Sequence, residues 1–271
     1  MTSEEARSLV NSLKRQGIIR SRRVEEAMLK VPRELFVWPG MERRAYEDVP
    51  LPLGDTGQTI SAPHMVAIML EELEVEEGNR ILEVGTGSGY NAALLAELAG
   101  REGKVVSVER VPELVEFARA NLRRAGYLDR VDVVLGDGSL GYPPRHEGPL
   151  YDRVVITAAA PRIPRYPLAQ LKDGGILLVP LGPPGYQVLT KVRRSGNSYR
   201  SEELMECVFV PLVGEDGYSA DGLHGLRRLP VRAGRQQETD RDQQRRPPDS
   251  EARLHNRSRR GQGRGRAERR A

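Results

Sequence analysis

Residues 57–65 read GQTISAPHM and place the hydroxyl group of Ser61 three positions before the imidazole of His64. A hydroxyl beside an imidazole is the nucleophile and general base of many hydrolases. Such a pair also needs an acid that orients the imidazole, and its serine often lies on a sharp G-x-S-x-G turn. TISAP is not such a turn. The stretch therefore leaves two interpretations: a nucleophilic serine, or a serine that positions a substrate.

A glycine-rich segment, LEVGTGSGY, spans residues 82–90. Its alternate glycines permit a sharp turn whose backbone amides approach a ligand closely. A dinucleotide-binding loop would need glycine where Tyr90 stands, and a phosphate-binding loop gains nothing from Glu83. An acid followed by G-x-G-x-G suits a ligand with a positive charge and an amino-acid tail, and S-adenosylmethionine has both. We therefore predict S-adenosylmethionine as the cofactor, bound by Glu83, Gly85, Thr86, Gly87, Ser88 and Gly89.

Two further positions fit the same ligand. Glu109 follows Gly89 by 20 residues and closes the next strand-like run, where a carboxylate can accept hydrogen bonds from both ribose hydroxyls. In the sequence GDG, Asp137 can accept a hydrogen bond from the adenine amino group, and Gly138 leaves room for the flat base. Each signal is weak alone. All three signals lie at the expected carboxyl ends of consecutive strands, and together they favour a cofactor site.

A sheet must position these residues, and the sequence predicts one. Apolar strand-like runs at 80–85, 104–110, 130–138, 151–161 and 174–182 alternate with helical segments. This alternation is typical of βαβ units and a parallel sheet. Two later runs, QVLTKVRR and ELMECVFVPLV, predict an antiparallel pair at the end of that sheet. We therefore predict an α/β fold with a doubly wound, mostly parallel, Rossmann-like core over residues 51–218.

A helical N-terminal extension is predicted before the core. Apolar residues recur at helical spacing behind Ser3 and again behind Ser21, and serine is a good N-cap. The proline-rich text from Val31 to Leu53 predicts an ordered loop that wraps over the core, and Pro63 predicts the start of a third helix. Residues 1–50 are thus expected to form the extension and the wrapping loop.

The residues from Ser219 onward differ in composition from the rest of the chain. They hold 15 Arg, no Lys and 7 acids, whereas residues 1–218 carry 27 basic and 31 acidic side chains. Without aromatic residues and with few branched aliphatic ones, they bury too little apolar surface to offset the entropy of ordering. We predict that residues 219–271 are a disordered, Arg-rich C-terminal tail.

Composition excludes several classes of protein. Cys207 is the only cysteine, so no intrachain disulfide can form, and we expect no metal site. Apolar runs such as GGILLVPLG are far shorter than a membrane span. The first residues, MTSEEARSLVNSLKRQG, do not resemble a secretory signal. We expect a soluble, cytoplasmic protein without membrane partners.

Several stretches together resemble the protein-L-isoaspartate O-methyltransferase family. They are GQTISAPHM, LEVGTGSGYNAALLA, VERVPELVEFARANL, GDGSLGYPP, YDRVVITAAAPRIP, QLKDGGILLVPLG and VFVPLVGEDGY. TISAPHM together with TAAAP is specific to this family rather than to methyltransferases in general. The resemblance covers residues 5–218 and implies the class I S-adenosylmethionine-dependent methyltransferase fold.

The resemblance also implies a function, which is protein repair. Such enzymes transfer a methyl group from S-adenosylmethionine to the α-carboxylate of L-isoaspartyl residues in damaged proteins, and the ester returns through a succinimide to aspartate. Ser61 matches the family's active-site hydroxyl and is implied to be the catalytic residue, with Thr59 and Ile60 beside it in the substrate site. A carboxylate is already nucleophilic, so no general base is needed, and His64 is expected to pack or to cap a helix.

Two other functions stay open at this point. An RNA methyltransferase would use the Arg-rich tail to contact RNA. A non-catalytic adaptor would merely retain the fold, although it would have no use for the glycine-rich loop, Glu109 and Asp137 together. Under the repair interpretation the partners are isoaspartyl-containing proteins and peptides, nucleic acid is expected only through the tail, and the enzyme is expected to be a monomer.

Overall fold

The computed structural model describes residues 3–220. The predicted tail from residue 221 onward lies outside the described residues. Within residues 3–220, no helix is long and apolar enough to cross a lipid bilayer.

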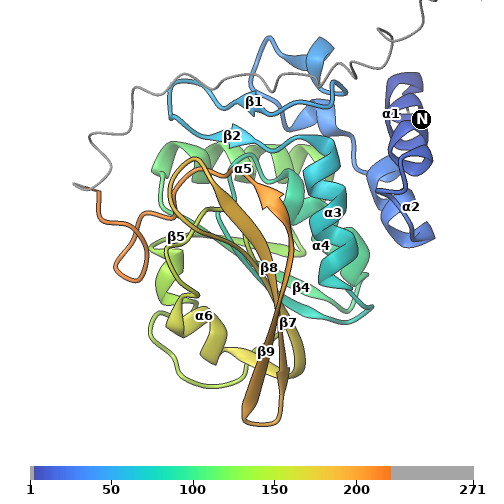
Figure 1. Ribbon diagram of the computed structural model, residues 1–271. Helices are drawn as coiled ribbons and strands as arrows, with labels where there is room; N and C mark the ends of the chain where they lie inside the picture. The colour runs from blue at the N-terminus through green and yellow to red at the C-terminus, as the bar shows by residue number, and fades with distance from the viewer. Residues whose placement is uncertain (1–2, 221–271) are drawn as a thin grey trace, which may run out of the picture. The chain divides into compact units, whose positions relative to one another are not determined.

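A seven-stranded sheet forms the centre of the described residues (Figure 1), in the order β5-β4-β3-β6-β7-β8-β9. Its strands are β3 (Arg80–Val84), β4 (Lys104–Glu109), β5 (Val131–Leu135), β6 (Tyr151–Ile156), β7 (Leu171–Leu181), β8 (Gln187–Ser195) and β9 (Ser198–Cys207). The first five strands in this order are parallel, and β8 and β9 add antiparallel. The predicted doubly wound, mostly parallel sheet with a terminal antiparallel pair is confirmed.

The strand order determines where a ligand can bind. The chain runs from β3 outward to β4 and β5, and then returns to β6 on the other side of β3. The connections leaving β3 and β6 therefore diverge, and they open a crevice at the carboxyl ends of β3, β4 and β6. Open α/β sheets bind their ligands at such a point.

Helices and loops cover both faces of the sheet. On one face pack α3 (Pro63–Leu73), α4 (Tyr90–Ala99) and α5 (Pro112–Ala125); on the other lie the short η3 (Gly138–Leu140) and α6 (Arg165–Ala169). Successive side chains along each strand point to opposite faces of the sheet. Ile81 and Val105 join the core below α3–α5, whereas Leu82 and Val106 join the core beneath α6.

The N-terminal extension is helical, as predicted. It comprises α1 (Glu4–Arg15) and α2 (Arg22–Lys30), which Figure 1 shows beside α3 and α4. The hydroxyl of Ser3 accepts a hydrogen bond from the Ala6 amide at 3.1 Å, and that of Ser21 accepts one from the Val24 amide at 3.2 Å. The predicted serine caps are therefore present, and the apolar side of each helix joins the core.

The connection between α2 and α3 contains more regular structure than the sequence predicted. It holds two 3₁₀ turns, η1 (Arg33–Leu35) and η2 (Glu42–Arg44), and an antiparallel hairpin of β1 (Leu51–Pro52) with β2 (Thr59–Ile60). Strands of two residues carry no readable periodicity, so the hairpin could not be predicted. It ends directly before α3 and thereby fixes the position of Ser61.

The last predicted strand lies earlier in the chain than expected. The run ELMECVFVPLV was expected to be one strand, but β9 begins at Ser198 and ends at Cys207. The chain then leaves the sheet edge and runs beside the end of β6, where the Ala159 amide donates to the Val210 carbonyl and the Leu212 amide donates to the Ala159 carbonyl, both at 2.8 Å. Pro211, which cannot donate a ladder hydrogen bond, lies within this crossing segment. The crossing brings Val210 and Leu212 to the crevice.

Candidate active site

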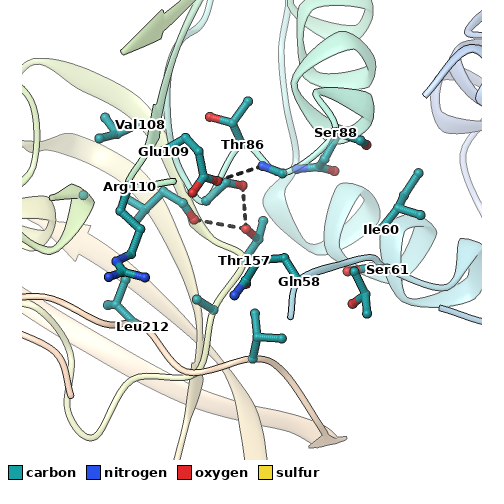
Figure 2. Close-up of a pocket in the computed structure, with 18 of the residues that line it drawn as sticks. Gln58, Ile60, Ser61, Thr86, Ser88, Val108, Glu109, Arg110, Thr157 and Leu212 are labelled. Carbon is teal, nitrogen blue, oxygen red and sulfur yellow. Dashed lines mark hydrogen bonds between the residues drawn. The ribbon is translucent and has the colours of Figure 1, made fainter. Parts of the chain in front are cut away.

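A cavity lies at the carboxyl ends of β3, β4 and β6. Figure 2 shows Glu109 and Arg110 on one side of it and Ile60 and Ser61 on the other, with Thr157 between them. Of the residues predicted from the sequence, those that line this cavity are Thr59, Ile60, Ser61, Gly85, Thr86, Gly87, Ser88, Glu109 and Gly138. The structure thus brings the predicted substrate segment and most of the predicted cofactor segment together.

The loop between β3 and α4 has a shape that requires glycine. Gly85, Gly87 and Gly89 have φ of 96°, 54° and 86°, in the left-handed region that side chains rarely adopt. A Cβ atom at Gly85 would lie 2.4 Å from Oγ1 of Thr157. That hydroxyl donates to the Gly85 carbonyl at 2.7 Å and holds the loop against β6. The open, amide-rich shape of this loop suits close approach by a ligand.

Glu109 faces the cavity from the last position of β4. One carboxylate oxygen accepts from the Gly87 amide at 3.0 Å and the other accepts from the Val111 amide at 2.9 Å. Each oxygen can accept a second hydrogen bond, because a carboxylate offers about four acceptor sites. Glu109 is therefore fixed in place and can still bind two hydroxyl groups of a ligand.

Glu83 lies behind the glycine-rich loop. Its side chain is fully buried, accepts hydrogen bonds from the Ser107 hydroxyl and from Nδ2 of Asn91, and is not among the cavity-lining residues. The Ser107 hydroxyl also lies 2.6 Å from that of Thr86, which does line the cavity. Glu83 thus supports the loop from below, and its direct contact with the cofactor stays a prediction.

The burial of Glu83 predicts a dependence of stability on pH. Desolvation, strengthened by the negative charge of Glu109, raises the pKa of Glu83 from 4.5 to about 7. The folded protein thus favours the protonated form, so this contribution to stability is complete below pH 4.5 and is lost as the pH rises through 7. We expect Glu83→Gln, which is neutral at every pH, to raise the melting temperature relative to wild type at about pH 8 but not at about pH 5.

Thermal melts of the ligand-free protein at these two pH values test this expectation. Glu203→Gln is the matched control, because Glu203 is exposed on the edge strand β9 and should show no such pH-dependent gain. A Glu83→Gln variant with the same change in melting temperature at both pH values would contradict a buried, titrating carboxyl group.

Asp137 lies beside the main cavity rather than in its wall. One of its carboxylate oxygens accepts from the amide and the hydroxyl of Ser139, at 2.9 and 2.7 Å, and the other accepts from the Glu215 amide at 2.7 Å. The residue lines a neighbouring hollow that shares Arg110 and Val213 with the cavity. Asp137 therefore ties the end of β5 to the segment 214–216, and its contact with adenine stays a prediction.

Gly138 follows Asp137 and lines the main cavity. A Cβ atom there would lie 2.4 Å from Cγ1 of Val84. A side chain at this position would therefore collide with the end of β3. The structure gives a packing reason for this glycine in addition to the flat space predicted for a base.

Ser61 follows β2 and lines the opposite side of the cavity (Figure 2). Its carbonyl accepts a hydrogen bond of 2.8 Å from Nη2 of Arg33. Among residues 3–220, the Ser61 hydroxyl makes no hydrogen bond, so it can donate to a substrate. Its neighbours Thr59 and Ile60 are held in place by the pairing of β2 with β1.

His64 lies at the start of α3 and does not line the cavity. Asp48 accepts from the His64 backbone amide at 2.8 Å and contacts Nδ1 of its ring at 2.9 Å. Asp48 is the orienting acid that the sequence did not reveal, but within the described chain Ser61 and His64 share no hydrogen bond. The serine–imidazole pair of a hydrolase is not formed, and His64 lies in the first turn of α3, where Asp48 accepts from its backbone amide.

Sequence reasoning also missed residues that shape the site. Arg33 and Asp48 come from the irregular loop before α3, and only the folded chain places them behind Ser61 and His64. Thr157 and Ala158, directly after β6, also line the cavity, whereas Ala159 is fully buried. The sequence signal that could have identified Thr157 is its position directly after a strand-like apolar run.

The comparisons with known proteins identify the family. A family model described as protein-L-isoaspartate(D-aspartate) O-methyltransferase matches residues 4–217. The chain belongs to this family. A protein-L-isoaspartate O-methyltransferase of Ignicoccus hospitalis is 51% identical over 214 residues, covering 79% of this chain and 99% of that protein. One of Methanopyrus kandleri is 53% identical over 211 residues, covering 78% and 92%.

Solved structures of the protein-L-isoaspartate O-methyltransferase family share the fold. One from Plasmodium falciparum, in complex with S-adenosyl-L-homocysteine, has a TM-score of 0.68 at 29% identity and covers 76% of this chain and 97% of that chain. Another has a TM-score of 0.70 at 32% identity and covers 78% and 67%. The predicted family and the class I methyltransferase fold are confirmed. The RNA methyltransferase alternative is not favoured.

Proposed function

We propose that this cavity transfers the methyl group of S-adenosylmethionine to the α-carboxylate of L-isoaspartyl residues in damaged proteins. The observation that carries the proposal is the arrangement of the cavity. The glycine-rich loop and Glu109 form one side, and the Ser61 hydroxyl faces them from the other. This arrangement supports a cofactor site and a hydrogen-bond donor for a carboxylate on two sides of one cavity.

The residues around Glu109 fit the cofactor. Glu109 would accept hydrogen bonds from the ribose hydroxyls, and the loop from Gly85 to Gly89 would hold the amino-acid tail. Gly138 and the hollow beside Asp137 would take the adenine. When bound, S-adenosylmethionine supplies an activated methyl group on a positively charged sulfur. The buried negative charge of Glu109 favours a positively charged ligand.

Ser61 would position the acceptor. Its hydroxyl donates to one oxygen of the substrate carboxylate, which leaves the other oxygen free to attack. Thr59 and Ile60 continue the same wall, and Val210 and Leu212 help to exclude water. Orientation of two reactants in this way can lower a barrier by about 7–11 kcal/mol. No general base is needed, because the carboxylate is already ionised at neutral pH.

The methyl ester then leads to repair without further help from the enzyme. Esterification gives the carboxyl carbon a leaving group, so the neighbouring backbone nitrogen can attack this carbon, expel methanol and close a succinimide. Opening of this ring gives some normal aspartate, and repeated cycles convert the remainder.

Methyl transfer to matched peptides tests this function. The purified full chain is incubated with radiolabelled S-adenosylmethionine and an isoaspartyl peptide, its aspartyl twin, or a transcribed RNA. We expect base-labile label in the isoaspartyl peptide alone. Label in the RNA, with none in the isoaspartyl peptide, would overturn the proposal in favour of an RNA methyltransferase. Equal label in the isoaspartyl and the aspartyl peptide would contradict specificity for isoaspartyl residues.

We also propose that residues 1–218 are the methyltransferase domain, with 1–50 as the extension and 51–218 as the core. Tyr218 supports this boundary, because its amide donates to the Leu212 carbonyl at 2.8 Å and its hydroxyl donates to the Gly182 carbonyl. The monomeric state, the cytoplasmic location and the disorder of residues 219–271 stay predictions.

Truncation tests this boundary. A chain that ends at Tyr218 keeps the anchors of that residue, so we expect its melting temperature and methyl-transfer rate to equal those of the full chain. A chain that ends at Val213 loses Tyr218 and the contact of Glu215 with Asp137, and it should melt at a lower temperature. A clear loss of stability in the chain that ends at Tyr218 would show that residues after 218 belong to the domain.

A further inference from the structure

Arg33 is a buried cation directly behind the wall that carries Ser61. Its side chain is 0% exposed. Nε donates to the Ala45 carbonyl and Nη2 donates to the Ser61 carbonyl, both at 2.8 Å. Nη1 has no hydrogen-bond partner, and it is the single buried side-chain nitrogen or oxygen in residues 3–220 of which this is true. The guanidinium is thus fixed by two carbonyls and incompletely satisfied.

Arg33 makes no direct ion pair within the described part of the chain. No carboxylate within residues 3–220 forms an ion pair with it; its central carbon lies 4.9 Å from the centre of the Tyr90 ring. Tyr90, Asp48 and Tyr46 are near enough to favour its charged form electrostatically, and Asp48 is also hydrogen-bonded to His64. Burial lowers the pKa of Arg33, yet a guanidinium stays protonated at neutral pH. A buried cation without a partner is strongly unfavourable by itself.

The position of Arg33 relates this charge to the site. Through the Ser61 carbonyl it contacts the residue whose hydroxyl faces the cavity, and the Tyr90 ring beneath it also lines the cavity. In a poorly solvated wall, a positive charge acts over several ångströms. An anion that binds at Ser61 would therefore meet a positive potential.

We propose that Arg33 is a positioning residue of a carboxylate subsite: it fixes the Ser61 backbone against the Ala45 carbonyl, and its charge, which no direct ion pair within residues 3–220 neutralises, favours a substrate carboxylate at the Ser61 hydroxyl. The inference rests on the proposed function, because it takes the substrate carboxylate as the anion. The subsite is complete only with this anion, which gives a buried, partly unsatisfied arginine a role at this position.

Charge discrimination in binding tests this role separately from stability. Two peptides are compared by calorimetry in the presence of S-adenosylhomocysteine: an isoaspartyl peptide, and the same peptide with the α-carboxylate converted to an amide. The wild type should bind the carboxylate form at least about 10-fold more tightly, the scale of a hydrogen-bonded charge. Arg33→Gln, which removes the charge, should lose most of this preference, whereas Arg33→Lys should retain it.

Arg153→Gln is the matched control. Arg153 is also buried and also donates to a backbone carbonyl, that of Glu74, but it lies on β6 away from the cavity. The Arg153→Gln variant should melt at a lower temperature than the wild type and should keep the wild-type preference for the carboxylate form of the peptide. The cofactor Kd should stay unchanged in all three variants, and KM for the isoaspartyl peptide should rise in Arg33→Gln.

The outcomes separate the two proposals. A wild type that neither methylates the isoaspartyl peptide nor prefers its carboxylate would overturn the proposed function and this inference with it. If the wild type does both, the variants decide. A carboxylate preference that is kept in Arg33→Gln, or lost in Arg33→Lys, would overturn the inference alone. If Arg33→Gln does not fold, Arg33→Lys still decides, because it retains the charge and loses the planar fork that spans two carbonyls.

Discussion

Replacement of Ser61 by alanine is expected to slow methyl transfer roughly 10- to 1000-fold, the range for loss of one orienting donor to a charged group at a reacting centre. The Ser61 hydroxyl makes no hydrogen bond within the described residues and faces the cavity, so its loss removes a substrate contact and no structural one. The affinity for S-adenosylmethionine should stay nearly unchanged, because the predicted cofactor residues lie on the opposite side. Rates and cofactor Kd are measured on one isoaspartyl peptide.

Two matched variants distinguish positioning from nucleophilic catalysis. Ser61→Thr keeps the hydroxyl and should recover much of the rate. His64→Gln should be nearly as active as wild type, because His64 contacts Asp48 rather than Ser61. The pH profile should lack a histidine-like limb near ~6.5. An inactive Ser61→Thr together with a covalent serine adduct in the wild type would show that Ser61 is a nucleophile.

Replacement of Glu109 by alanine is expected to weaken S-adenosylmethionine binding by roughly 1.5–3 kcal/mol, the scale of charge-assisted hydrogen bonds. The carboxylate is held by the amides of Gly87 and Val111, so it is oriented before the ligand arrives. The variant loses both the acceptor for the ribose and the support of the loop at Gly87. Calorimetry gives the Kd directly.

Controls for Glu109 separate the acceptor from the general effect of charge. Glu109→Gln keeps the shape and one acceptor oxygen, and its affinity should lie between those of the wild type and the alanine variant. Glu113→Gln removes an acid from the first turn of α5, outside the cavity, and should leave the Kd unchanged. An unchanged affinity in Glu109→Ala would remove Glu109 from the ribose role.

The sheet was predictable because its signals are local. The alternation of apolar runs with helices determines β3 to β7, and the caps at Ser3 and Ser21 follow from residue type alone. Most of the cavity was predictable for a related reason: the carboxyl ends of parallel strands meet at one edge, so Gly85 after β3 and Glu109 at the end of β4 had to lie close together.

The residues that the sequence did not reveal depend on contacts between distant segments. Arg33 reaches Ser61 across 28 positions, and Asp48 reaches His64 across 16. The connection that contains Arg33 and Asp48 has no helical or strand-like periodicity from which their positions could be predicted. The last strand-like run was expected to continue through Pro211, and only the folded chain shows that it crosses to the end of β6. Polar residues that support a site from behind therefore become apparent only in the folded structure.

A crystal structure with S-adenosylhomocysteine and an isoaspartyl peptide tests the central claim most directly. We predict that the ribose hydroxyls contact the Glu109 carboxylate and that the Ser61 hydroxyl donates to one oxygen of the peptide α-carboxylate. A peptide carboxylate bound away from Ser61, or a cofactor held outside the loop from Gly85 to Gly89, would contradict the proposed site.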